Sequence, residues 1–377
     1  MLPADAQSDL DLCSIHHWFP HLRATSIRTT LIPLDAAFTK YLTTDGVFVP
    51  DAGDADDDAS SDGHDDSAWD ESDDAEAEAT HERFPALEEA ITAAITKHGG
   101  ACFPKLNWSA PSDAAWVLGG SLKCASARDV LLLLKSSDRI AHDLCEARRG
   151  AYGGPIDEST SFPWTLALRS WCNLRPSSEF RCFGVAHGAV LVAACQRDRF
   201  SHYPFLEAAR SAALEQLTQF ATRAFGGGGS AVLPGRVVWD AYIDANDKVH
   251  LIDVAPFEAA TDPLLFEWDE LTRLADLAEA CLAGAADAVE LLLEPASAAG
   301  DRVVLTLHAI QPTAATGATP LPAELRLTPE YGVAPSAQMY YGWPQELREV
   351  GGSDIGALLE AARAASLHAT ASKAQGG

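Results

Sequence analysis

Two aspartates in one hairpin are the residues whose spacing most directly suggests chemistry. The segment GRVVWDAYIDANDKVHLIDVAPF, residues 235–257, has the pattern of two strands joined by a turn at 244–247. This turn predicts that Asp240 lies opposite Leu251. Because side chains alternate along a strand, Asp240 and Asp253 then share one face as diagonal neighbours, roughly 7 Å apart at the backbone.

Two carboxylates aimed at one spot of an apolar hairpin repel each other. Their desolvation costs several kcal/mol unless a cation lies between them. Mg²⁺ and Ca²⁺ are the natural candidates, because hard cations prefer carboxylate oxygens. The alternative is that each aspartate pairs with an arginine or faces solvent.

Basic residues on other predicted strands complement this pair. Lys105 ends the apolar run CFPK, and Arg169 and Arg181 lie in two later strands, where Glu179 shares the face of Arg181. Cations opposite a carboxylate pair would suit a metal-bound triphosphate, because they neutralise phosphate oxygens. Taken singly, a basic residue on a strand is more often a surface charge, and the joint arrangement makes that reading less favoured.

Other kinds of site have weaker support. The twelve histidines are dispersed, and the adjacent His16 and His17 are expected at a strand edge without a role. The eight cysteines form no CxxC pair, which argues for reduced thiols in a cytosolic or nuclear protein and against a structural zinc site. No residue set indicates a covalent nucleophile. GGGGS at 226–230 lacks a following Lys-Ser/Thr and is interpreted as a flexible connection.

Charge and hydropathy narrow the function classes. The 377 residues carry a formal net charge of −27, and residues 51–82 contain 15 acidic residues and no lysine or arginine. That segment is too charged to fold alone, so it is either a solvated insertion or an arm for a basic partner, with Trp69 as an apolar anchor. The acidity argues against nucleic-acid binding. No apolar run approaches the roughly 20 residues of a membrane span, and residues 1–19 lack a signal-peptide pattern.

Hydrophobic periodicity predicts a mixture of helices and strands. Helices are expected at 35–43, 84–100, 126–144, 203–225 and 353–365. Strands are expected at 18–22, 25–34, 45–50, 102–105, 164–174 and 302–307, with two hairpins at 179–198 and 236–257, the first turning at 187–188. The long helix at 203–225 should bury Leu206, Ala213, Leu214, Leu217 and Ala221.

Ordered motifs across most of the chain resemble the cell division cycle protein 123 family. They are FPKLNWSAPSDAAW, SLKC, LLKSSD, EFRCF, QRD, LIDVAPF and TDPLLFEW. The segments WFPHLRATSIRTTLIPL and YGWPQELREV and the tryptophan within the acidic segment also fit this family. Together the motifs are specific, whereas no single one would be.

The resemblance implies an α+β, ATP-grasp-like fold with two subdomains, 1–165 and 166–377, that bind ATP and magnesium between them. It further implies a cytoplasmic assembly factor that binds the gamma subunit of translation initiation factor 2, so that the alpha subunit can join. We expect a monomer without a metabolic ligase reaction. Two alternatives stay open: an ATP-dependent ligase or kinase, and a scaffold that has lost nucleotide binding.

The resemblance also implies roles for individual residues. Phosphate contacts are expected from Lys105 and Arg181, with Glu179 nearby. The loop that closes over the phosphates would be Asn107, Trp108, Ser109 and Ala110, and the strand beside the adenine would contribute Arg169, Trp171 and Cys172. The magnesium ligands would be Asp240 and Asp253.

The sequence departs from the family pattern near the predicted metal site. Ala255 stands where the family has an asparagine, and Asn173 stands where relatives have a glutamate. Water or Glu258 could replace the missing oxygen ligand, since magnesium retains several waters in most sites. Equally, metal binding could be weakened or lost.

Overall fold

The computed structural model describes residues 8–44, 83–147, 162–226, 232–283 and 323–329. All of them belong to one compact unit, residues 1–332. The predicted acidic insertion at 51–82, the connection at 227–230 and the predicted elements at 45–50, 302–307 and 353–365 lie outside the described residues. In the described part of the chain, no helix combines the length and the apolar character needed to cross a bilayer.

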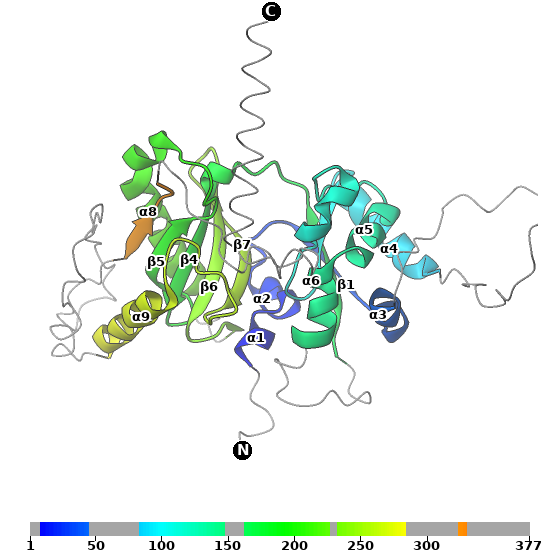
Figure 1. Cartoon of the computed structure of the whole chain (residues 1–377), viewed down its shortest axis with the longest axis horizontal. Helices are drawn as coiled ribbons and strands as arrows, with labels where there is room; N and C mark the ends of the chain where they lie inside the picture. The colour runs from blue at the N-terminus through cyan, green and yellow to red at the C-terminus, as the bar shows by residue number, and fades with distance from the viewer. Residues whose placement is uncertain (1–7, 45–82, 148–161, 227–231, 284–322, 330–377) are drawn as a thin grey trace, which may run out of the picture. The chain divides into compact units, whose positions relative to one another are not determined.

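The first sheet has three antiparallel strands in the order β1 (Thr29–Pro33), β3 (Thr165–Ser170) and β2 (Cys102–Lys105). Four helices lie between β1 and β3 in the chain: α3 (Ala36–Thr43), α4 (Pro85–Lys97), α5 (Ala127–Lys135) and α6 (Asp138–His142). Two short helices, a 3₁₀ turn at Ser112–Leu118 and a π turn at Asp143–Ala147, complete this part (Figure 1). These elements share one apolar core, which includes Ile91, Leu134 and Leu166.

The second sheet has five strands in the order β7 (Val249–Pro256), β6 (Val237–Ile243), β4 (Glu179–Val185), β5 (Val190–Gln196) and β8 (Glu324–Arg326). All of its pairs are antiparallel except β5 with β8. A short 3₁₀ turn at Pro176–Ser178 precedes β4. Two further helices, α1 (Asp9–Leu12) and α2 (Ile15–Leu22), pack against β7.

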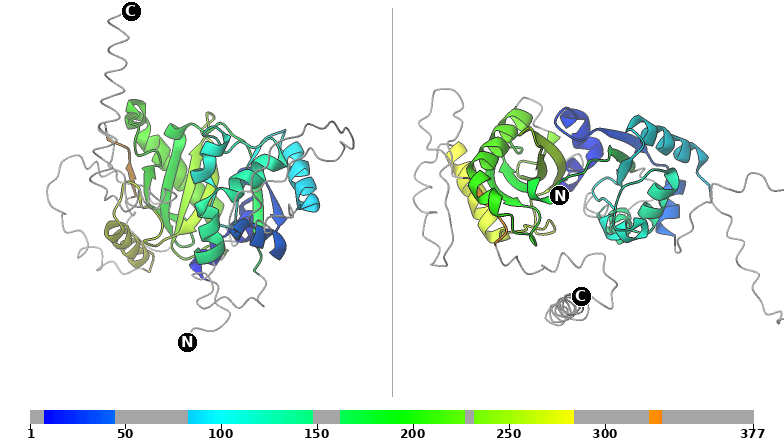
Figure 2. Two further views of the ribbon diagram at one scale, coloured as in Figure 1. Left: turned by 45° about the vertical axis from the view of Figure 1, so that its right-hand side comes forward. Right: turned by 90° about the horizontal axis from the view of Figure 1, so that it is seen from above.

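Helices cover both faces of the five-stranded sheet, because its strands are apolar on both sides. Trp239 belongs to the core that includes α8 (Pro204–Phe225), whereas its neighbour Val238 belongs to the core that includes α9 (Trp268–Leu282). Successive side chains point to opposite faces of a strand, so α8 and α9 lie on opposite faces of the sheet, as Figure 2 shows.

The periodic segments folded as predicted. The helix at 203–225 exists as α8 and buries all five predicted core residues. The strand that ends at Lys105 and the two hairpins are also confirmed. In the first hairpin, His187 and Gly188 have positive φ values of 58° and 88° and form the turn at the predicted place.

Two predictions of secondary structure were wrong. Residues 18–22, expected as a strand, belong to helix α2, where Trp18 and Phe19 are buried on one side. The single helix expected at 126–144 is divided, because the Ser137 side chain accepts a hydrogen bond from the Ile140 backbone N–H and starts a new helix.

The register predicted for the second hairpin was also wrong. Its loop is longer than expected, since the backbone N–H of Asp244 donates to Lys248, and Ile243 pairs with Val249. A β-bulge at Ile252 then shifts the pairing once more, so that Asp240 lies directly opposite Asp253. The two aspartates are direct rather than diagonal neighbours.

Candidate functional site

Three charged side chains form one row across the five-stranded sheet. Arg181 of β4 pairs with Asp240 of β6, and Asp240 pairs with Asp253 of β7. Residues directly opposite each other in antiparallel strands point to the same face, with Cβ atoms about 4.5–5.5 Å apart. We call Arg181, Asp240 and Asp253 the charged row.

Asp240, in the middle of the charged row, is held by two arginines. Arg181 donates from Nε and Nη2 to its two carboxylate oxygens at 2.8 and 2.9 Å, and Arg197 donates from Nε at 3.1 Å. Burial alone would raise the pKa of Asp240, but the charges and hydrogen bonds of both arginines outweigh it and lower the pKa to about 2. Asp240 therefore matches the alternative in which an aspartate pairs with arginine.

Asp253, at the end of the charged row, meets a lysine from the other sheet. Lys105 Nζ lies 2.8 Å from Asp253 Oδ2 and also donates to the backbone carbonyl of Trp108. The lysine side chain is 2% exposed, whereas the Asp253 side chain is 30% exposed. The pair joins the end of β2 to β7 and leaves part of one carboxylate accessible to solvent.

A buried aspartate that the sequence analysis did not single out holds the loop after Lys105. Asp143 accepts hydrogen bonds from the Ser109 backbone N–H at 2.8 Å and from the Ser109 hydroxyl at 2.9 Å. Burial raises the pKa of Asp143 to about 6, although the Ser109 hydrogen bonds and the Lys105 charge act in the opposite direction. Asp143 has no distinguishing local sequence signal, because its partner lies 34 residues earlier in the chain.

Two more predicted residues of this loop, Asn107 and Trp108, connect it to the N-terminal helices. Asn107 is fully buried; its side-chain amide donates to Ser14 Oγ at 3.1 Å, and its backbone carbonyl accepts from Ile15. The Trp108 indole N–H donates to the Leu10 carbonyl at 2.7 Å. Both side chains therefore fix the loop to α1 and α2.

Arg169 is buried and reaches the β-bulge. Its Nη1 donates to the Ile252 carbonyl at 2.5 Å and its Nη2 to the Ser26 hydroxyl at 3.2 Å, and the Ser26 hydroxyl in turn donates to the Leu251 carbonyl. Burial lowers the pKa of Arg169 to about 10, although the charge of Asp253 opposes the shift. The guanidinium thus connects β3 to β7 at Ile252, the residue directly before Asp253 of the charged row.

The remaining predicted residues lie at the margins of this arrangement. The Trp171 indole N–H donates to the Asn173 side chain at 3.0 Å, and Cys172 is exposed. Glu179 lies 3.4 Å from Arg197, and the Ala110 carbonyl accepts from Ser112 in the loop. Among the described contacts, only that of Glu179 leads to the charged row, through Arg197 and Asp240.

The donor set partly fits a magnesium-bound triphosphate. Asp253 offers a hard carboxylate ligand that is partly exposed, and Lys105 and Arg181 offer charges for phosphate oxygens. Asp240 already accepts three hydrogen bonds from arginines. Ala255 follows Asp253 on the same face and packs against the apolar core of α9, and its methyl side chain supplies no oxygen ligand. The Asp253 carboxylate is therefore partly accessible, whereas the Asp240 carboxylate is occupied by Arg181 and Arg197.

Comparisons with known proteins identify related chains. Two fungal relatives, from Aspergillus niger and Sclerotinia sclerotiorum, are each named translation initiation factor eIF2 assembly protein and are each 36% identical over 273 residues. The match covers 70% of this chain in both cases, 71% of the first relative and 64% of the second, which is less than two thirds of that protein.

The fold has a solved counterpart. The structure of Cdc123 from Schizosaccharomyces pombe matches with a TM-score of 0.59 and 27% sequence identity, covering 85% of this chain and 97% of that one. The predicted α+β class is confirmed by the two sheets and their helices, and this solved structure shares the fold. The D123 family profile matches residues 18–335. This chain therefore belongs to the D123 family, the family of cell division cycle protein 123 that its motifs resemble.

Proposed function

We propose that this chain is an ATP- and magnesium-binding assembly factor that binds the gamma subunit of translation initiation factor 2 and promotes formation of the heterotrimer. The proposal includes action as a cytoplasmic monomer that does not bind nucleic acid. The observation that carries it is the contact of Lys105 with Asp253 at the end of the charged row, in a chain of the D123 family. The names of the fungal relatives support the assembly role.

The charged row suggests how the chain would hold the nucleotide. Asp253 is the accessible carboxylate and would bind magnesium, which supplies charge neutralisation between phosphate oxygens when bound. Lys105 and Arg181 would hold phosphate oxygens, and Asp240 would keep the Arg181 guanidinium in place. Trp108 and Ser109 belong to the loop that orients Lys105, since the Trp108 carbonyl accepts from its ammonium group.

Arg169 and Trp171 would have a different role, beside the base rather than the phosphates. Arg169 fixes β3 to the bulge of β7, and the Trp171 ring lies 6.4 Å from that of Phe103. A strand anchored at one end and followed by an aromatic side chain suits the edge of an adenine pocket. Cys172 and Asn173, which follow, are both exposed and available to such a ligand.

Two measurements test the nucleotide and partner parts separately. Calorimetry with ATP, with and without Mg²⁺, should show magnesium-dependent binding that Lys105→Ala reduces at least tenfold. Lys123→Ala, which removes an exposed lysine outside the site, should bind like the wild type. Co-purification with isolated gamma subunit tests the partner. Absence of a complex between the purified wild-type chain and the gamma subunit would exclude the assembly role.

A scaffold without nucleotide is the second candidate, and the geometry of Asp240 favours it specifically. Its carboxylate is satisfied by Arg181 and Arg197 within the chain, and Ala255 removes a third oxygen ligand. If the wild type binds the gamma subunit equally well with and without ATP, and calorimetry detects no ATP binding, this second function holds. The two candidates therefore give opposite results in the calorimetry.

A further inference from the structure

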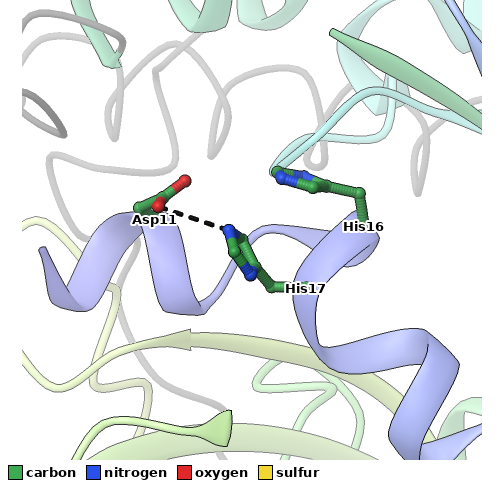
Figure 3. A group of neighbouring side chains, drawn as sticks. All are labelled: Asp11, His16 and His17. Atoms are coloured by element: carbon green, nitrogen blue, oxygen red, sulfur yellow. Dashed lines mark ion pairs between the residues drawn. The ribbon is translucent and has the colours of Figure 1, made fainter. Parts of the chain in front are cut away.

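A second group of polar side chains lies in the N-terminal helices, separate from the charged row. Asp11 of α1 and His16 and His17 of α2 converge, as Figure 3 shows. One ligand atom from each lies within 4.8 Å of the others, and His17 Nε2 is 3.3 Å from Asp11 Oδ2. We call these three residues the N-terminal triad. The histidines were expected at a strand edge without a role, and their helical position brings them here.

Asp11 is the member of the N-terminal triad that most needs a partner. The residue is 3% exposed, and its Oδ1 atom accepts no hydrogen bond from the described part of the chain. A buried carboxylate oxygen without a partner is costly, and native proteins satisfy nearly all such atoms with a hydrogen bond, an ordered water or an ion. His17 satisfies only the other oxygen.

His16 is oriented by the N-cap residue of its own helix and by the loop after Lys105. Its Nδ1 lies 2.6 Å from Ser14 Oγ, and the buried Asn107 amide donates to that same hydroxyl oxygen at 3.1 Å. The Asn107 amide nitrogen also lies 3.2 Å from Nδ1, and it has the Ser14 hydroxyl and the Pro163 carbonyl as acceptors for its two hydrogens. A metal on Nε2 would therefore select the tautomer in which Nδ1 donates to Ser14, because the lone pair of Nε2 is then available. Histidine ligands commonly have such a hydrogen bond on the second ring nitrogen, which fixes the ring.

We propose that the N-terminal triad binds a divalent transition-metal ion of the Zn²⁺ class, with Asp11, His16 and His17 as ligands and the fourth position open. Two imidazoles with one carboxylate suit Zn²⁺ and its neighbours, whereas Mg²⁺ and Ca²⁺ prefer oxygen ligands throughout. Ligand atoms around a tetrahedral zinc lie about 3.3 Å apart, given Zn–N distances of about 2.0–2.1 Å. The His17–Asp11 separation already has this value.

The position of the N-terminal triad gives the ion a structural consequence. Asp11 and the histidines come from two short helices, so a shared ion would fasten α1 to α2. The same helices hold the loop after Lys105, through Ser14 with Asn107 and through Leu10 with Trp108. The inference does not rest on nucleotide binding, because none of the three ligands is part of the charged row.

Titration of the full chain with Zn²⁺ tests the proposal. The decisive variant is His17→Gln, because the His17 side chain is 27% exposed and its replacement should leave the fold intact. His21→Gln is the matched control, since His21 is an exposed histidine of the same helix. We expect one Zn²⁺ bound by the wild type and the control, at least tenfold weaker binding by His17→Gln, and a Zn²⁺-dependent rise in melting temperature that only His17→Gln loses.

Cysteines and the acidic segment at 51–82 could also bind zinc, and the variants separate these sources. Co²⁺ absorption in the wild type should report nitrogen and oxygen ligands without a thiolate charge-transfer band. If His16→Ala/His17→Ala retains the wild-type zinc stoichiometry and melting shift, the ion is bound elsewhere and the proposal is overturned. Failure of the wild type to bind Zn²⁺ at micromolar concentration would overturn it as well.

Discussion

Neighbouring aspartates of the charged row differ in how their charge is balanced. Asp240 is 5% exposed at its side chain and shares its two oxygens between Arg181 and Arg197. Asp253, directly opposite on β7, is 30% exposed and has one lysine partner. The first arrangement is a closed network within the sheet, whereas the second leaves part of a carboxylate open to solvent, as the proposed metal binding requires. Adjacent positions in one row can therefore have different roles.

Removal of the buried Asp240 charge should cause the largest loss of stability. Asp240→Asn leaves Arg181 and Arg197 without their anion, and breaking a buried ion pair typically costs about 3–5 kcal/mol. Urea unfolding would measure the loss of stability. Asp276→Asn, which removes a 52% exposed partner of Arg236, should change stability by about 1 kcal/mol or less. Equal losses in the two variants would contradict the comparison.

Asp253→Asn should weaken magnesium-dependent ATP binding and should destabilise the fold less than Asp240→Asn does. Lys105 keeps the Trp108 carbonyl as an acceptor, so the loss of stability should be on the order of 1–3 kcal/mol, below that of Asp240→Asn. Magnesium-dependent ATP binding, measured by calorimetry, should weaken at least tenfold. An unchanged affinity would mean that the accessible carboxylate is not the metal ligand.

The buried Asp143 should make stability depend on pH. Its pKa is raised to about 6, so its contribution is fully present below its unfolded pKa near 4 and is lost as pH rises through about 6. Between pH 5 and pH 7.5 the wild type should therefore lose stability relative to Asp143→Asn, by an amount on the order of 1 kcal/mol. Urea unfolding of both proteins at the two pH values measures this, and parallel curves would refute it.

The smallest expected effect is a gain in magnesium-dependent ATP affinity. Ala255→Asn places an amide oxygen two residues after Asp253 on the same face, where the resemblance implies an asparagine. We expect magnesium-dependent ATP affinity to rise severalfold, with a modest loss of stability because Ala255 packs against the apolar core of α9. Ala255→Gln, with its longer side chain, serves as the control for polarity alone. Equal affinities of Ala255→Asn and the wild type would place the metal away from this position.

The periodicity of the sequence predicted the elements that position the site. The apolar run before Lys105 and the alternating segments around Asp240 became the expected strands, because both patterns match a period of two. The strand predicted at residues 18–22 was wrong, because a five-residue run is too short to distinguish a strand from a helix. Tertiary burial of Trp18 decided the outcome.

Contacts between distant segments could not be predicted in the same way. The arginine partners of Asp240 lie 59 and 43 residues away, and Asp143 lies 34 residues from Ser109. The register was missed because a β-bulge has no reliable local signature when the inserted residue is an ordinary isoleucine. The resemblance supplied residue types, and only the fold could show which of them are already paired.

The bulge at Ile252 has a consequence for insertions and deletions in β7. Deleting Ile252 would leave Asp240 opposite Asp253 and Ala241 opposite Leu251, so both faces of the hairpin would keep their side chains. The deletion would remove the partly buried Ile252 side chain and the carbonyl that accepts from Arg169. The extra residue is therefore a connector between two sheets, and a chain one residue shorter would be expected to keep its hairpin while loosening its hold on β3.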